Sequence, residues 1–274
     1  MKHLMFFLAV GVASFMHLQA QDKDDRAEMT PQMTEKWSPK PQKVDPGKLP
    51  CGGFNPPPSD AIVLFNGTDL SHWQEYTDRR GRISDDTVVF TSNSGDEAKW
   101  DIVDGILVVD KKEEDIRTKQ LFDDFQLHIE WKIPEDITGE GQLRGNSGIF
   151  LQGIYELQIL DVYENKTYVN GQAASIYKQT PPMVNAMRPP GEWNVYDIIY
   201  QAPTYWKNGA YKTKPTITVL HNGVLVHHNT KIHGTTSYIG LPKVVVHGKG
   251  PVGLQAHDDE SEPISFRNIW IREL

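Results

Sequence analysis

Apolar and polar residues alternate with a period of two along most of the chain after residue 60. The clearest alternation is in FQLHIEWK, residues 125–132, whose apolar positions are Phe125, Leu127, Ile129 and Trp131. This spacing predicts an extended strand with one apolar face. TITVLHNGVLVHH, residues 216–228, predicts a hairpin, because its two alternating runs flank Asn-Gly, the pair that a type I′ turn prefers.

Other short apolar runs follow at regular spacing, and none longer than a turn or two has the period of a helix. DIVDGILVVD, residues 101–110, predicts two strands around Asp-Gly, and ISFRNIWIREL, residues 264–274, predicts the last strand. Many short strands over this length predict an all-β protein, a jelly-roll β-sandwich of two antiparallel sheets. We expect residues 61–274 to form this one domain.

Residues 21–60 are polar and rich in proline, so they cannot bury enough apolar surface to fold independently. They are predicted to be a linker or an arm that lies on the domain. Trp37 is the exception in this segment, and we expect it to pin the arm to the surface.

Residues 1–20 have the features of a cleavable export signal. Lys2 and His3 precede an apolar run over residues 4–16, and Leu-Gln-Ala at 18–20 resembles a cleavage site. The apolar run is too short to span a bilayer, and no longer run follows. The mature protein is therefore predicted to be periplasmic or secreted, without insertion into the membrane.

Charge and cysteine content restrict the partners. The formal net charge is −8, and removal of the signal makes it more negative, because the positive charge of Lys2 is lost. This balance disfavours nucleic acid as a ligand and is compatible with a neutral carbohydrate. Cys51 is the single cysteine, so no disulfide framework is available and stability has to come from a core.

The strand YELQILD, residues 155–161, carries the candidate chemistry. If Tyr155, Leu157 and Ile159 face the core, Glu156 and Gln158 face the opposite side. Asp161 would then share the parity of the core, which is a costly place for a charge. We predict a β-bulge after Gln158 that turns Asp161 toward Glu156, because bulges re-aim side chains next to active sites. In the alternative interpretation, Glu156 and Gln158 only solvate the sheet and Asp161 caps a turn.

The spacing of these three residues resembles the E-x-D-x-x-E strand of laminarinase- and lichenase-type glucanases. In those enzymes the first carboxylate is the nucleophile and the last is the proton donor. The resemblance therefore implies these roles for Glu156 and Asp161. Here Gln158 replaces the middle carboxylate and Asp161 is shorter than glutamate. An ordinary double displacement requires two carboxyl groups about 5 Å apart, and this set is poorly suited to it.

Further segments follow in order along the chain, namely VLFNGTDLSHW, GNSGIFLQ, YELQILD, GEWN, HNGVLV, GLQAH and FRNIWIREL. Together they resemble the 3-keto-disaccharide hydrolase domain family over about residues 60–274. The resemblance implies a concanavalin A-like jelly roll that acts on sugars already oxidised at C3. A ketone at C3 acidifies the hydrogen at C2, so the glycosidic bond can break by elimination, followed by hydration. A conventional glucanase and a non-catalytic, lectin-like carbohydrate-binding module remain the alternatives.

Such an elimination needs a base, an acid and a group that stabilises the enolate. Glu156 is the first candidate for the base and Asp161 for the proton donor, with His257 as a further base and Lys119 as the enolate-stabilising cation. The expected substrate-binding residues are Gln158, Arg144, Asn146, Tyr177 and Trp193. Tyr177 is the expected stacking residue because it lies in a long irregular segment, and such segments are usually functional.

Cofactors and partners follow from the same chemistry. The sequence identifies no certain cofactor, and the alternative is a divalent metal held by Glu156, Asp161 and His257. The expected ligand is a small carbohydrate. A separate sugar 3-oxidoreductase would have to supply the ketone.

Overall fold

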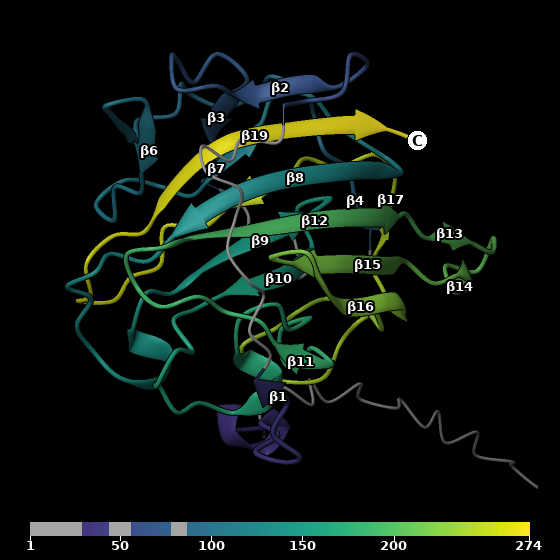
Figure 1. Ribbon diagram of the computed structural model, residues 1–274. Coiled ribbons are helices and arrows are strands. Elements are labelled where there is room, and N and C mark those ends of the chain that lie inside the picture. Colours follow the sequence, from purple (N-terminus) through teal and green to yellow (C-terminus); the bar gives the residue numbers. More distant parts are fainter. Residues whose placement is uncertain (1–28, 44–55, 78–86) are drawn as a thin grey trace, which may run out of the picture.

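The computed structural model describes residues 29–43, 56–77 and 87–274, and two stacked antiparallel sheets form its centre (Figure 1). The larger sheet has the order β16-β15-β12-β8-β19-β6-β5, and β2 also pairs with β19. Its strands are β2 (Ile62–Phe65), β5 (Asp101–Val103), β6 (Ile106–Val108), β8 (Phe125–Lys132), β12 (Trp193–Gln201), β15 (Thr216–His221), β16 (Val224–Lys231) and β19 (Ser265–Glu273). The predicted jelly-roll sandwich is confirmed.

The smaller sheet has five strands in the order β10-β9-β18-β7-β3. They are β3 (Trp73–Glu75), β7 (Ile116–Thr118), β9 (Ser147–Leu151), β10 (Tyr155–Ile159) and β18 (Gly253–Leu254). Three two-stranded pairs lie outside the sandwich: β1 (Gln42–Lys43) with β11 (Val184–Asn185), β4 (Thr87–Val88) with β17 (Val246–His247), and β13 (Thr204–Tyr205) with β14 (Tyr211–Thr213). Short 3-10 turns are η2 (Pro31–Thr34), η3 (Gly141–Leu143) and η4 (Val169–Gly171).

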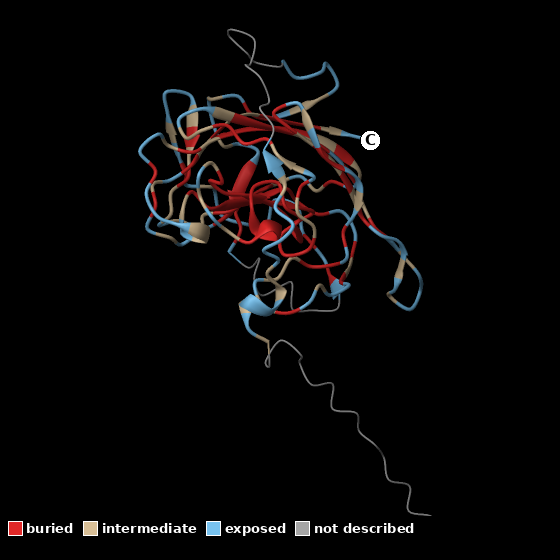
Figure 2. Ribbon diagram, turned by 60° about the horizontal axis from the view of Figure 1, so that its bottom comes forward, coloured by how far each residue is buried: buried red, intermediate tan, exposed pale blue. Residues whose placement is uncertain are grey.

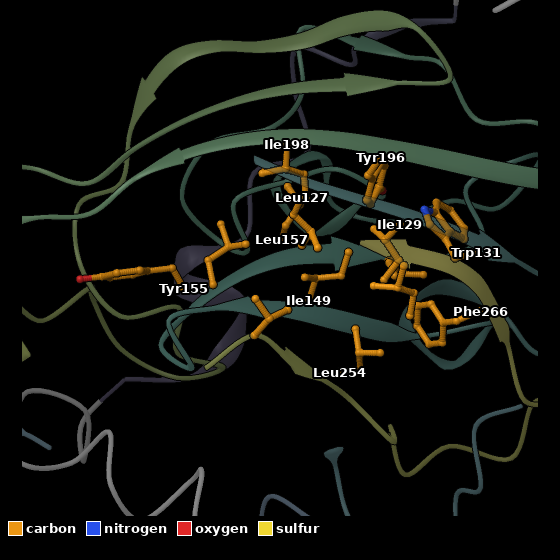
Figure 3. Packing of buried hydrophobic residues seen from close by; sticks show 14 of the residues in the cluster. Leu127, Ile129, Trp131, Ile149, Tyr155, Leu157, Tyr196, Ile198, Leu254 and Phe266 are labelled. Atoms are coloured by element: carbon orange, nitrogen blue, oxygen red, sulfur yellow. The ribbon is translucent and has the colours of Figure 1, made fainter. Parts of the chain in front are cut away.

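The core lies between the two sheets, where side chains from both inner faces interdigitate (Figure 3). The four apolar residues of the alternating pattern in β8 are all completely buried, and β12 adds Tyr196 and Ile198 to the same layer. Ile149 and Leu157 meet them from the smaller sheet. Each such side chain contributes about 1.5–3 kcal/mol through burial, so this layer rather than the loops holds the sandwich together.

The predicted hairpin turns are confirmed. Asn222 and Gly223 have φ values of 54° and 80°, and Asp104 and Gly105 have 50° and 76°. A type I′ turn requires positive φ at both central positions, which asparagine, aspartate and glycine tolerate best.

The described part of the N-terminal arm, residues 29–43, lies on the domain at the end opposite β2 (Figure 1). β1 pairs in parallel with β11, and the Trp37 ring meets the Tyr168 ring edge-on at 6.2 Å between centroids. Residues 1–20, with the predicted signal, and Cys51 lie outside the described residues. Among the described residues, no helix is both long and apolar enough to cross a lipid bilayer.

Candidate active site

The outer face of the smaller sheet carries the predicted polar residues of β10. Leu157 is completely buried in the core, so its neighbours Glu156 and Gln158 lie on the other face of the strand. Gln158 pairs with Gly148 of β9, and the N–H of Gln255, just after β18, donates to the Gly148 carbonyl at 3.1 Å. Residues far apart in the chain therefore meet around Gly148.

Gly148 is the floor of this site, because the Glu156 side chain lies directly over it. A Cβ atom placed on Gly148 would come within 2.7 Å of Glu156 Oε1 and 3.0 Å of its Cγ. Two backbone hydrogen bonds fix Glu156 itself: its N–H donates to Thr236 Oγ1 at 3.0 Å, and its carbonyl accepts the N–H of Tyr177 at 3.1 Å. The backbone of Glu156 is thus held on both sides, and only 8% of the residue is exposed.

Three amide oxygens surround the floor, and none of them has a hydrogen-bond partner in the described part of the chain. They are Gln158 Oε1, Asn146 Oδ1 and Gln255 Oε1, all buried. The orientations of the first two are fixed, because Gln158 Nε2 donates to the Gly171 carbonyl at 3.3 Å and Asn146 Nδ2 to the Gln142 carbonyl at 2.8 Å. Buried polar atoms normally have partners, so these acceptors match a ligand rich in hydroxyl donors.

His257 comes two residues after Gln255, beyond the end of β18, and is held by a carboxylate. Its Nδ1 lies 2.8 Å from Asp259 Oδ2, which leaves Nε2 available to the site. Lys111 Nζ also binds Asp259, at 2.7 Å, and the Ser261 hydroxyl donates to it. Burial alone would raise the pKa of the Asp259 carboxyl, but the hydrogen bonds from His257, Lys111 and Ser261 hold it well below its usual range. Asp259 was not among the predicted site residues. Its position two residues after His257 was the one feature of the sequence that could have identified it.

Tyr177 lies beside Glu156, at the free edge of β10. Its hydroxyl is 2.8 Å from that of Tyr168, and burial, together with the neighbouring Tyr168 hydroxyl and Glu156 carboxylate, raises the pKa of Tyr177 well above its usual range. Its ring is mostly buried, with 9% of the residue exposed. The predicted stacking residue therefore belongs to the wall of the site but offers little open ring surface.

The predicted bulge after Gln158 is wrong. β10 pairs with β9 in regular register from Tyr155 to Ile159, and the strand ends there. Asp161 stays completely buried, with Arg144 Nε at 2.6 Å from its Oδ2 and the Tyr163 N–H at 2.9 Å from its Oδ1. The cost of burying this charge is offset by an ion pair and not by a turn toward Glu156. Asp161 in turn holds Arg144, whose side chain remains 30% exposed.

Two predicted site residues lie elsewhere. Lys119 follows β7 and pairs with Glu97 at 3.1 Å, and β7 is separated from β10 by two strands. Trp193 begins β12, in which Tyr196, Ile198 and Tyr200 face the core, so strand parity puts Trp193 on the outer face of the larger sheet. There the Arg267 guanidinium lies 4.1 Å from its ring centroid. Neither residue joins Glu156.

The described residues include no group of three or more histidine, cysteine, aspartate or glutamate side chains arranged to hold a metal ion. Glu156, Asp161 and His257 therefore do not converge on one coordination site. Their separate partners are the reason, since Arg144 binds Asp161 and Asp259 binds His257.

Known proteins are similar to the chain in both sequence and structure. The family described as the 3-keto-alpha-glucoside-1,2-lyase-like domain matches residues 60–272. The crystal structure of a protein of Parabacteroides distasonis ATCC 8503, provisionally named a glycosyl hydrolase, superposes on this chain with a TM-score of 0.74. The two sequences are 57% identical, and the match covers 89% of this chain and 97% of that chain. A second protein of that strain with the same provisional name is 25% identical, with a TM-score of 0.51 over 78% of this chain and 99% of that chain.

A 3-keto-disaccharide hydrolase of Bacteroides thetaiotaomicron is 29% identical over 167 residues. The match covers 50% of this chain and 51% of that protein, so the chain spans about half the length of this curated relative.

Proposed function

The chain belongs to the 3-keto-alpha-glucoside-1,2-lyase-like domain family, and from that membership we propose that it cleaves the glycosidic bond of glycosides already oxidised to a ketone at C3. The observation that carries this proposal is the Glu156 carboxylate lying over Gly148 among three unpartnered amide oxygens. A sugar ring on this floor would donate its hydroxyl protons to those oxygens and present the hydrogen at C2 to the carboxylate.

The first step is proton abstraction next to the ketone. Glu156 takes the proton from C2, the electrons of that bond form C2=C3, and negative charge develops on O3. Arg144 is the cation that we assign to O3, in place of Lys119. Asp161 holds its Nε at 2.6 Å and leaves part of the guanidinium exposed. A charge fixed in advance in this way stabilises a developing anion without reorganisation.

The second step expels the aglycone. The electrons return from O3, C1=C2 forms, and the bond from C1 to the aglycone oxygen breaks while that oxygen takes a proton from His257 Nε2. Water then adds across C1=C2: its hydroxyl goes to C1, its proton returns to His257, and Glu156 gives its proton back to C2. The products are the free 3-keto sugar and the aglycone alcohol, and both residues regain their starting protonation.

The two alternative functions are supported less well. A conventional glucanase needs a second carboxyl group about 5 Å from the first, and Asp161 is ion-paired with Arg144 at the end of the strand. A lectin-like module would use the same amides but has no need of a histidine held by a carboxylate. A separate sugar 3-oxidoreductase would supply the ketone, and we propose that the protein meets this substrate after export.

The test is turnover of a 3-keto-glucoside beside its unoxidised parent by the purified protein. We expect cleavage of the ketone alone, and loss of turnover in Glu156→Gln with an unchanged circular dichroism spectrum. Glu192→Gln, at an exposed position, is the matched control and should keep full activity. Equal cleavage of both glycosides would favour the glucanase, and binding without cleavage of either would favour the lectin.

A further inference from the structure

The outer edge of β10, the last strand of the smaller sheet, is not exposed to solvent along its length. The segment 174–177 covers the free edge of this strand, with the Gln158 N–H donating to Ser175 at 2.9 Å and the Tyr177 N–H donating to Glu156. The N-terminal arm packs against the longer segment 168–178, on the side away from β10. The order across the site is therefore the arm, the segment 168–178, β10 with Glu156, β9 with Gly148, and β18.

The arm is attached to this segment by specific hydrogen bonds. Asn170 binds the arm on both sides, because its Oδ1 accepts the Lys36 N–H at 2.8 Å and its Nδ2 donates to the Thr34 carbonyl at 3.0 Å. Lys178 Nζ donates to the Pro31 carbonyl at 2.9 Å and to the Tyr238 carbonyl at 2.8 Å. Both residues are buried, so residues 31–37 have a defined position next to the site and are not a loose linker there.

Aromatic side chains gather at this junction, and two of them are open to solvent. Trp37 is 56% exposed and Tyr238 is 62% exposed, although large apolar side chains normally bury most of their surface. The Trp37 ring packs edge-on against Tyr168, and Lys178 Nζ lies 4.7 Å from the Tyr238 ring and 5.4 Å from that of Tyr168. In Figure 2 the exposed turn of the arm lies at the lower margin of the domain, outside its buried centre.

We propose that Trp37 of the arm, with Tyr238, forms the subsite that binds the ring of the aglycone. This inference rests on the proposed function and extends it to the leaving group. With the glycone over Gly148, a substituent at C1 that extends past Glu156 crosses the edge of β10 and reaches the exposed rings. Adjacent extended segments lie about 4.8 Å apart, so an aglycone ring one spacing beyond Glu156 lies over the segment 168–178, where the Trp37 ring packs on Tyr168. Aromatic faces bind the apolar faces of sugar and aryl rings by dispersion and water exclusion.

The experiment compares two substrates: a 3-keto-disaccharide, which has a ring aglycone, and methyl 3-keto-glucoside, which has none. We expect Trp37→Ala to lower kcat/KM roughly three- to tenfold for the disaccharide and to leave the methyl glucoside unchanged. Trp37→Phe should restore most of the loss. Trp206→Ala is the matched control, because Trp206 is 58% exposed but lies on the loop between β13 and β14, away from the arm (Figure 1).

Equal losses on both substrates, or no loss on either, would overturn the subsite. Failure of the wild-type protein to cleave both substrates would instead contradict the proposed function. The subsite is then decided by calorimetric titration with 4-nitrophenyl glucoside, an unoxidised glycoside with an aryl ring. Weaker binding by Trp37→Ala than by wild type and Trp206→Ala supports the subsite, and equal affinity for all three proteins rejects it.

Discussion

Asp259 Oδ2 lies 2.8 Å from Nδ1 of His257, and this contact determines which nitrogen of the ring can reach a substrate. An ionised carboxylate only accepts hydrogen bonds, so Nδ1 carries a proton and Nε2 is left to exchange one. The carboxylate is itself completely buried and bound by Lys111 at 2.7 Å. The direction of the imidazole is thus fixed by Asp259, which Lys111 holds in turn.

The first prediction concerns this pair. Asp259→Asn should lower kcat roughly ten- to hundredfold with little change in KM. An amide can accept a hydrogen bond from Nδ1 or donate one to it, so it no longer keeps the proton on Nδ1 and Nε2 free for proton exchange. Steady-state kinetics with a 3-keto-glucoside measure the split. Asp258→Asn, at the exposed neighbouring position, should behave as wild type. A rise in KM at constant kcat would show that Asp259 does not act through His257.

The second prediction uses the glycine beneath Glu156. Gly148→Ala would place a methyl group 2.7 Å from Glu156 Oε1, so the carboxylate has to move, and a displacement of this kind costs roughly a hundredfold in kcat/KM. The thermal midpoint should change little. Gly248→Ala is the control, since a Cβ atom there meets nothing within 4 Å. Unchanged activity in Gly148→Ala would mean that the position of the carboxylate over β9 is unimportant.

Much of the fold was predictable because it depends on local periodicity. The alternation in β8 and the Asn222–Gly223 turn are set by neighbours in sequence, and both were confirmed. The parity of Glu156 and Gln158 followed in the same way. The environment of Asp161 did not, because its compensation comes from Arg144, which the η3 turn brings alongside and which no periodic pattern identifies.

The contacts between residues far apart in the chain also could not be predicted from the sequence. Gln255 meets Gly148 only because β18 inserts between β7 and β9, a crossover that depends on the topology of the whole sheet. Lys119 and Trp193 were misplaced for the same reason. The sequence does not show their distance from β10 or the sheet to which they belong.

The third prediction follows from the place of Trp193. Trp193→Ala should leave KM for a 3-keto-glucoside unchanged, because the ring lies on the larger sheet and packs under the Arg267 guanidinium at 4.1 Å. Loss of this cation–π contact should lower the free energy of unfolding by about 1 kcal/mol. Urea denaturation measures the second effect. A several-fold increase in KM with unchanged stability would return Trp193 to the substrate site.

The larger sheet also carries a buried cluster of charges that should make stability depend on pH. His128 Nδ1 lies 2.6 Å from Asp197 Oδ1, and Glu130 lies on the other side of the ring, bound by Arg267 at 2.6 Å. The ring stacks on Trp270 at 5.1 Å. Burial alone would lower the pKa of His128, but the hydrogen bonds and charges of Asp197 and Glu130 raise it to about 9. The folded protein therefore binds this proton more tightly than the unfolded chain.

The fourth prediction is the consequence for the free energy of unfolding. A pKa of about 9 in the folded state against 6.5 in the unfolded state contributes about 3 kcal/mol. This contribution is complete below pH 6.5 and is lost as the pH rises through 9. In urea denaturation, the difference in stability between wild type and His128→Asn should thus shrink from pH 6 to pH 10. His228→Asn, at an exposed position, should show no such trend. A difference that stays constant over this range would show that His128 is neutral in the folded protein and that its ring contributes through packing on Trp270 alone.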